Sequence, residues 1–181
     1  MRVFQHPDTP LSGRGEQEAL RVAARLVGAG IGLVLTSDFA RARATAERIA
    51  AASGASLEVE PLLRERDFGA LRGRPYAELG LDPFAPGYTP PGGESVAAFH
   101  SRVAQAFALI VERRRALSGA LVVVTHGLVC HAIVANHSDA GALPDHFDNT
   151  GLTELAPEPP FTARRINCTQ HLVGGAAPGA Y

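Results

Sequence analysis

The stretch Leu121-Val-Val-Val-Thr-His-Gly-Leu-Val129 decides the fold that the sequence predicts. Its apolar, largely β-branched run stops abruptly at Thr125-His126-Gly127. Such a run is typical of a parallel strand buried on both faces, and the apolar residues 128–135 that follow suit a packed helix. We therefore expect His126 at a turn from strand to helix. Ligands bind at such turns in open α/β sheets, because free N–H groups at the helix start attract anions.

Two further segments repeat this pattern of a strand followed by a polar side chain. The amino terminus, Arg2-Val-Phe-Gln-His-Pro7, predicts a short apolar strand that ends in His6. Residues 33–46 predict a strand, a turn able to cap a helix, and a helix with Arg41 in its first turns. One buried histidine is more often structural than functional, so the repetition is what favours a site. We expect His6, Arg41 and His126 to meet at the carboxyl edge of one sheet.

Length and composition restrict the class of protein. The 181 residues suffice for a hydrophobic core, and we expect a single domain over residues 1–181. The net charge of −1 and the pI near 6.7 argue against binding to nucleic acid or an anionic membrane surface. No stretch has the length of a signal-peptide core or a bilayer span, so we expect a cytoplasmic protein. Cys130 and Cys168 are too few for a disulfide framework, and we expect free thiols.

The other elements complete an α/β pattern. Ser12 is a natural N-cap for a helix that runs to about Val27, and Ser95 is one for a long amphipathic helix. With the strands above, these helices predict a three-layer α/β sandwich, in which a mostly parallel central sheet has helices on both faces. The sequence also predicts a closing hairpin at residues 151–155 and 162–167, and a frayed tail at residues 174–181.

Residues 60–92, here called the lid segment, are rich in glycine, proline and charged residues. Long loops over a rigid α/β scaffold often carry function, so this segment predicts a lid or a specificity element. Three of the histidines after His126 could suggest a metal site, but no two of them have the spacing of a helical zinc pair, and no thiol or carboxylate cluster accompanies them. We expect no metal site and no cofactor. The three histidines are His131, His137 and His146.

Six groups of residues, in order along the chain, resemble the motifs of the histidine phosphatases, the superfamily that includes the cofactor-dependent phosphoglycerate mutases. The resemblance implies the phosphoglycerate mutase-like fold, which agrees with the α/β pattern above. The chain departs from the family at its opening motif, where Arg-His-Gly is replaced by Gln5-His6-Pro7. The six groups are His6; Leu11–Gln17; Ser37-Asp38 with Arg41-Ala42 and Thr45-Ala46; Leu63–Gly69 with Gly73; Pro91–Ser95; and Thr125–Gly127.

The resemblance implies a phosphatase that hydrolyses phosphate monoesters through a covalent phosphohistidine. The nucleophile would be His6, and Glu65 would protonate the leaving oxygen. The partner would be a small phosphorylated substrate or inorganic phosphate, and the sequence leaves the oligomeric state open. By the same resemblance, His126 completes the catalytic set, and Gln5, Arg41 and Gly127 are expected to contact the phosphate.

The altered opening motif leaves two interpretations. A neutral Gln5 lacks the charged bidentate clamp of an arginine, and Pro7 lacks a backbone N–H. The loss of one comparable donor lowers a rate by roughly 100- to 1000-fold. The first interpretation is therefore a weakened phosphatase, and the second is an impaired pseudoenzyme that binds an anionic ligand or a partner protein. Without the resemblance to the family, Glu65 and Arg41 could equally be ordinary charged residues of the protein surface.

Overall fold

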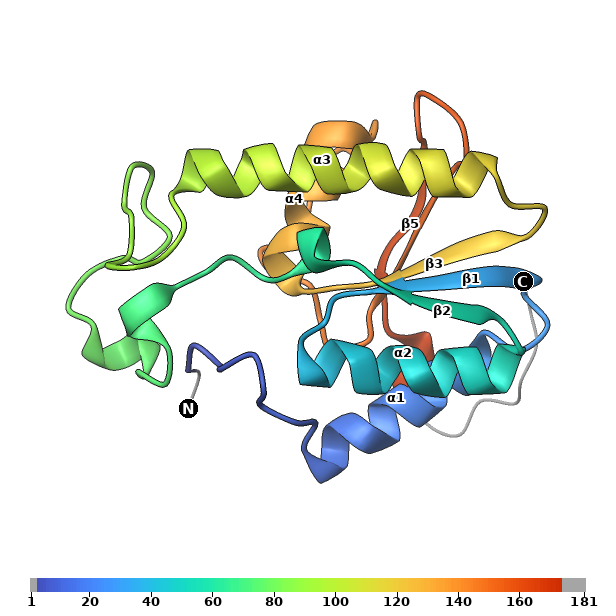
Figure 1. Ribbon diagram of the computed structural model, residues 1–181, viewed down its shortest axis with the longest axis horizontal. Helices are drawn as coiled ribbons and strands as arrows, with labels where there is room; N and C mark the ends of the chain where they lie inside the picture. Colours follow the sequence, from blue (N-terminus) through green and yellow to red (C-terminus); the bar gives the residue numbers. More distant parts are fainter. Residues whose placement is uncertain (1–2, 174–181) are drawn as a thin grey trace.

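The computed structural model describes residues 3–173 and has three layers (Figure 1). Its central sheet is parallel, with strand order β2-β1-β3. Helices α1 and α2 cover one face, and α3 and α4 cover the other. The predicted α/β class, with helices on both faces of a parallel sheet, is confirmed. The bounds are α1 Gly13–Arg25, β1 Ile31–Thr36, α2 Ala40–Ser53, β2 Ser56–Val59, α3 Val96–Arg115, β3 Ala120–Val124 and α4 Gly127–His137.

The helices begin where the sequence predicts. The Ser12 side chain accepts a hydrogen bond from the Gly15 N–H, and the Ser95 side chain accepts one from the Ala98 N–H. These caps satisfy N–H groups that have no partner inside the helix. Apolar residues of α1, α2 and β1 form one buried cluster, and those of α3 and α4 form another. The two clusters lie on opposite faces of the sheet.

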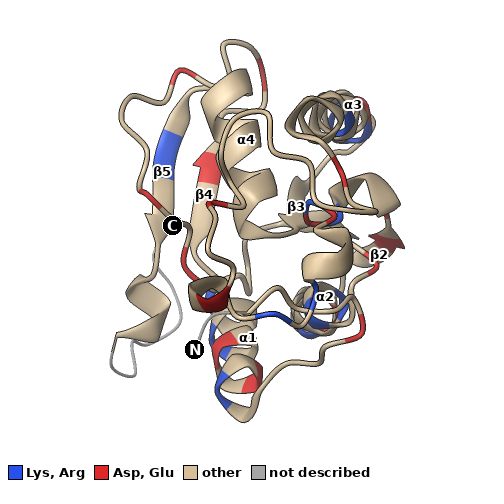
Figure 2. Ribbon diagram, turned by 90° about the vertical axis from the view of Figure 1, so that its left-hand side faces the viewer, with Lys and Arg blue, Asp and Glu red and all other residues tan. Residues whose placement is uncertain are grey.

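A second sheet stands apart from the first. Strands β4 (Leu152–Leu155) and β5 (Ala163–Cys168) are antiparallel, which confirms the predicted hairpin. Figure 2 shows this pair beside α4. Leu155 and Phe161 pack against the α3–α4 cluster, so the hairpin extends the core on that side. The predicted tail at residues 174–181 lies outside the described residues.

The prediction of an amino-terminal strand is wrong. Within residues 3–9 the structure gives only an isolated antiparallel bridge between Val3 and Pro75. Phe4 is 3% exposed, and its ring lies 4.2 Å from the ring centroids of both Phe68 and Tyr76. The packing of the Phe4 ring against aromatic rings of the lid segment therefore fixes the amino-terminal segment. Pro7 has no N–H with which to extend a strand. In Figure 1 both segments lie to the left of the sheet.

Strand β2 was also missed, because residues 56–60 resemble a loop between Gly54 and Pro61. The strand is four residues long, lies at the edge of the sheet and is mostly exposed, so it carries little hydrophobic pattern.

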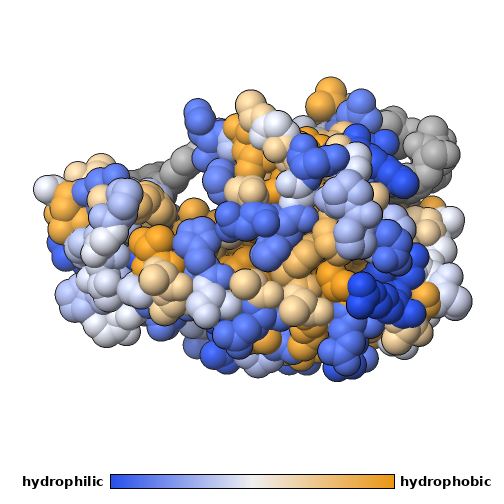
Figure 3. All heavy atoms as spheres, turned by 90° about the horizontal axis from the view of Figure 1, so that it is seen from above, coloured by the Kyte–Doolittle hydropathy of each residue, from blue (hydrophilic) through white to orange (hydrophobic). Residues whose placement is uncertain are grey.

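Hydrophilic and apolar residues are interspersed on the surface of the molecule on the side of α3 (Figure 3). Between residues 3 and 173, no helix has the length and apolar character needed to cross a bilayer.

Candidate active site at the carboxyl edge of the sheet

Arg41 joins three of the predicted site segments. It lies in the first turn of α2, directly after the carboxyl end of β1. Its Nη1 donates a hydrogen bond of 3.2 Å to the backbone oxygen of His6, and its Nη2 lies 3.3 Å from Nδ1 of His126. The Ala40 N–H also donates to the Pro7 oxygen, at 3.0 Å. The predicted convergence is therefore seen, although His6 contributes its backbone rather than its ring to these contacts.

His126 is buried, with 8% of its surface exposed, and caps the start of α4. Burial, and then the positive charges of Arg41 and Arg102, lower its pKa to about 3. The ring is thus neutral at physiological pH. An arginine only donates, so Nδ1 accepts from Arg41, and the ring proton sits on Nε2, which lies 3.0 Å from Ser37 Oγ. Both ring nitrogens have partners, and the ring fixes the Arg41 guanidinium.

Glu65 lies in the lid segment and faces the start of α4. Its Oε1 accepts from the Arg66 N–H at 3.0 Å, and its Oε2 accepts from the Leu128 N–H at 3.3 Å. Burial raises the pKa of this carboxyl, whereas the two N–H groups and Arg41 act in the opposite direction. Glu65 therefore keeps its proton to a higher pH than an exposed glutamate does. This property suits a proton donor.

The opening motif lies at the surface. Gln5 and His6 are both exposed. The His6 ring lies against Gly73 of the lid segment. A Cβ placed on Gly73 would lie only 3.3 Å from Nε2 of His6. Gly73 has φ +80°, a conformation that favours glycine. Gly127 is exposed too, with open space where a Cβ would stand. The structure thus leaves the side of the site next to Gly127 accessible.

Two arginines that the sequence did not single out hold the lid segment in place. Arg66 is 5% exposed and donates to three backbone oxygens, those of Tyr88 at 2.7 Å, Glu94 at 3.1 Å and Pro83 at 3.3 Å. Burial lowers its pKa. Arg102 of α3 pairs with the Glu94 carboxylate through two bonds of 2.9 and 2.8 Å. Its Nη1 also donates to the oxygens of Leu62 and Arg64, on either side of Leu63, and so helps to place the following Glu65.

The two cysteines are free and differ in environment. Burial, with a smaller effect of Glu65, raises the pKa of Cys130 to about 12. For Cys168 burial acts in the same direction, but hydrogen bonds from the Gln170 N–H and from Arg25, 3.4 Å away, outweigh it and lower the pKa. The Cys168 thiol is therefore the more readily ionised of the two.

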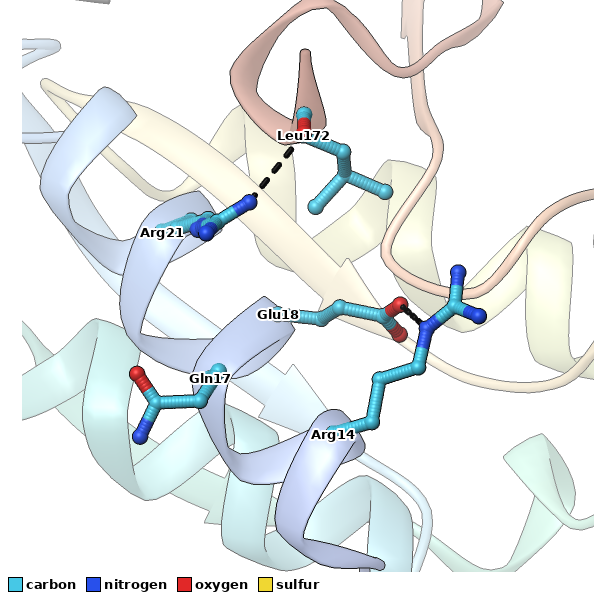
Figure 4. A pocket seen from close by; sticks show the side chains of 5 residues that line it. All are labelled: Arg14, Gln17, Glu18, Arg21 and Leu172. Carbon is cyan, nitrogen blue, oxygen red and sulfur yellow. Dashed lines mark hydrogen bonds and ion pairs between the residues drawn. The ribbon is translucent and has the colours of Figure 1, made fainter. Parts of the chain in front are cut away.

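A hollow of about 310 Å³ lies between α1 and the turn at Gln170–Leu172 (Figure 4). Its two arginines already have partners, since Arg14 binds Glu18 at 2.6 Å and Arg21 binds the Leu172 oxygen at 3.1 Å. None of the predicted site residues lines it. Within residues 3–173 no three histidine, cysteine or carboxylate side chains are grouped as a metal site would need. The five residues that line the hollow are Arg14, Gln17, Glu18, Arg21 and Leu172.

Residues 1–168 match the model of the histidine phosphatase superfamily, branch 1. The chain belongs to this superfamily. The resemblance predicted from six groups of residues is thereby confirmed. The chain is 32% identical over 145 residues to "Probable phosphoglycerate mutase GpmB" of Salmonella paratyphi B, a match that covers 74% of this chain and 66% of that protein. It spans 34% of the GpmB protein of Escherichia fergusonii, with 42% identity over 73 residues.

Solved structures of histidine phosphatase fold confirm the architecture. Bacillus stearothermophilus YhfR superposes with a TM-score of 0.76 and 27% identity, over 95% of this chain and 90% of that one. Mycobacterial glucosyl-3-phosphoglycerate phosphatase in complex with VO3 superposes with a TM-score of 0.73 and 26% identity, over 86% and 83% of the two chains. The mycobacterial protein has also been solved with inorganic phosphate. Phosphatases are thus among the structural neighbours of this superfamily member.

Proposed function

We propose that this chain hydrolyses phosphate monoesters through a covalent phosphohistidine at His6. One observation carries the proposal: Arg41 links the His6 backbone to a neutral His126, close to a carboxyl, Glu65, whose pKa is raised. A cation, a proton donor and a nucleophile at one sheet edge are what phosphoryl transfer to an imidazole requires. A mycobacterial neighbour has been solved in complex with VO3 and with inorganic phosphate, which supports a phosphate ligand for this chain.

In the first step, a nitrogen of the neutral His6 ring attacks phosphorus, and the bond from phosphorus to the ester oxygen breaks. The leaving oxygen takes the proton of Glu65. In the second step, Glu65 accepts a proton from water while the water oxygen attacks phosphorus. The bond from phosphorus to nitrogen then breaks, which releases inorganic phosphate and restores the His6 ring and protonated Glu65.

Arg41 would bind the phosphoryl oxygens, with His126 as the residue that orients it. The incoming oxygen and Nδ1 of His126 compete for the same guanidinium edge, because Nη2 of Arg41 already lies 3.3 Å from Nδ1. The Gly127 N–H, at the start of α4, is a further donor for an anion. Gln5 supplies amide donors without charge, so the transferring group is neutralised less than by an arginine.

We expect the His6 ring, which rests against Gly73, to turn toward Arg41 before it attacks. The ring is exposed, and the structure gives it no hydrogen bond within residues 3–173, so this rotation breaks none of the described hydrogen bonds. The need to turn, together with the uncharged Gln5, supports a slow enzyme.

A second candidate function is a pseudoenzyme that binds an anionic ligand or a partner protein without turnover. The exposed Gln5 and the His6 ring held against the lid segment favour it. The phosphatase and an anion-binding pseudoenzyme both predict phosphate binding that depends on Arg41, whereas only the phosphatase predicts turnover that depends on His6.

Hydrolysis of a panel of aryl and alkyl phosphates by the wild type, His6→Ala and Arg41→Gln separates the two. The phosphatase predicts turnover in the wild type and none above background in His6→Ala. The pseudoenzyme predicts no turnover in any of the three, with phosphate affinity lost only in Arg41→Gln. Equal turnover by the wild type and His6→Ala would contradict the proposed mechanism.

A further inference from the structure

Arg72 lies on the lid segment at the point where that segment touches the opening motif. It ends the short turn Gly69–Leu71, and the next residue is Gly73, against which the His6 ring rests. The Gly73 N–H donates to the Phe4 oxygen at 2.6 Å, two residues before His6. The backbone of Arg72 is thus tied to the segment that carries the proposed nucleophile.

The Arg72 guanidinium forms an ion pair through one of its three nitrogens. Its Nη2 pairs with Oδ1 of Asp67 at 3.0 Å, and its side chain is 27% exposed. The same Asp67 oxygen accepts the Gly69 N–H at 2.8 Å, which fixes the carboxylate. Within residues 3–173, Nε and Nη1 of Arg72 make no hydrogen bond. They are free to bind a ligand.

The positive charge of Arg72 also acts on Arg41. Burial lowers the pKa of the Arg41 guanidinium, and the positive charge of Arg72 lowers it further, against the effects of Glu65 and Tyr76. Two guanidinium groups near one another repel unless an anion lies between them. A phosphate monoester carries about two negative charges at neutral pH, so two guanidinium groups match its charge, whereas Arg41 alone would leave about half of it unneutralised.

We propose that Arg72 is a phosphate-binding residue, which grips the phosphoryl group of the substrate together with Arg41 beside His6. The assignment rests on the proposed function for the identity of the ligand as a phosphate monoester. Gln5 is exposed and neutral, so Arg72 supplies the second charge from the lid segment instead of from the opening motif. Asp67 positions the guanidinium by binding one of its terminal nitrogens.

The test compares Arg72→Gln with Arg74→Gln, which removes the same charge from an exposed arginine two residues away. We expect Arg72→Gln to weaken binding of inorganic phosphate and orthovanadate by about 10- to 100-fold in calorimetry, and to lower kcat/KM by at least as much. Arg72→Lys keeps the charge but loses the planar fork, so it should fall between Arg72→Gln and the wild type. Arg74→Gln should match the wild type.

Asp67→Asn separates a role of Arg72 in binding from one in folding, because it breaks the same ion pair but retains the Arg72 side chain. We expect it to lose less phosphate affinity than Arg72→Gln. Equal losses in these two variants, equal affinities in Arg72→Gln and Arg74→Gln, or a wild type that binds no phosphate would each overturn the assignment.

The assignment and the proposed function can fail separately. If His6→Ala abolishes turnover while Arg72→Gln leaves phosphate affinity and kcat/KM unchanged, the phosphatase stands and the role of Arg72 is refuted. If Arg72→Gln weakens phosphate binding although no variant of His6 affects hydrolysis, the binding role of Arg72 stands and the phosphohistidine mechanism fails.

Discussion

Replacing Arg66 by methionine should destabilise the protein, because the buried guanidinium donates to two backbone oxygens of the lid segment and to that of Glu94, just beyond it. The bond lengths of 2.7, 3.1 and 3.3 Å make two of the three bonds strong. Hydrogen bonds from a charged group contribute about 1.5–3 kcal/mol each. Removing the desolvation penalty of the guanidinium offsets part of this loss, so we expect the free energy of unfolding to fall by about 3 kcal/mol. That corresponds to a drop in Tm of about 6–12 °C.

Urea unfolding followed by circular dichroism measures this change, and Arg64→Met is the matched control. Arg64 is exposed, and its ion pair with Asp38 lies at the surface, so its loss should change the free energy of unfolding by less than about 1 kcal/mol. Limited proteolysis should cut Arg66→Met first within residues 64–93. Equal unfolding free energies for Arg66→Met and the wild type, or equal losses in the two variants, would show that Arg66 does not anchor the lid segment.

Three further predictions concern the site and the thiols. Glu65→Gln should lower kcat on alkyl phosphates by about 100-fold or more and on aryl phosphates much less. Its pH–rate profile should lack the fall in activity that the wild type shows as pH rises through the raised pKa of Glu65 and the donor proton is lost. Iodoacetamide at pH 7.5 should alkylate Cys168 first, as peptide mass spectrometry would detect, and faster labelling of Cys130, whose pKa is about 12, would contradict the described environments. Gln5→Arg and Pro7→Gly, singly and together, should raise kcat/KM on aryl phosphates by roughly 100-fold, and a folded but inert double variant would favour the pseudoenzyme.

The elements that the sequence predicted are those whose signals are local. Ser12 and Ser95 cap helices through their own side chains, and the apolar run at residues 121–124 forms strand β3, although this strand is half-buried at an edge of the sheet and not buried on both faces as predicted. The position of His126 at the start of α4 follows from these local rules. Its ring tautomer does not, because that depends on Arg41 and Ser37, which are distant in the chain.

The amino-terminal segment shows why local pattern was insufficient. Its short apolar run suggested a strand, but whether Phe4 enters a sheet or an aromatic cluster depends on Phe68 and Tyr76, more than sixty residues later. The same holds for Arg66, whose partners are backbone oxygens of the distant part of the lid segment. Every residue has a backbone oxygen, so a contact to one particular backbone oxygen cannot be predicted from residue types.

The phosphohistidine itself is the most direct test of the central claim. The protein is mixed with a phosphate monoester, quenched during turnover and digested, and the modified peptide is identified by mass spectrometry. We predict a phosphate on His6 that is labile in acid and stable in base, and that is absent from His6→Ala. Measurable hydrolysis with no phosphate on His6 at any time during turnover would contradict the account.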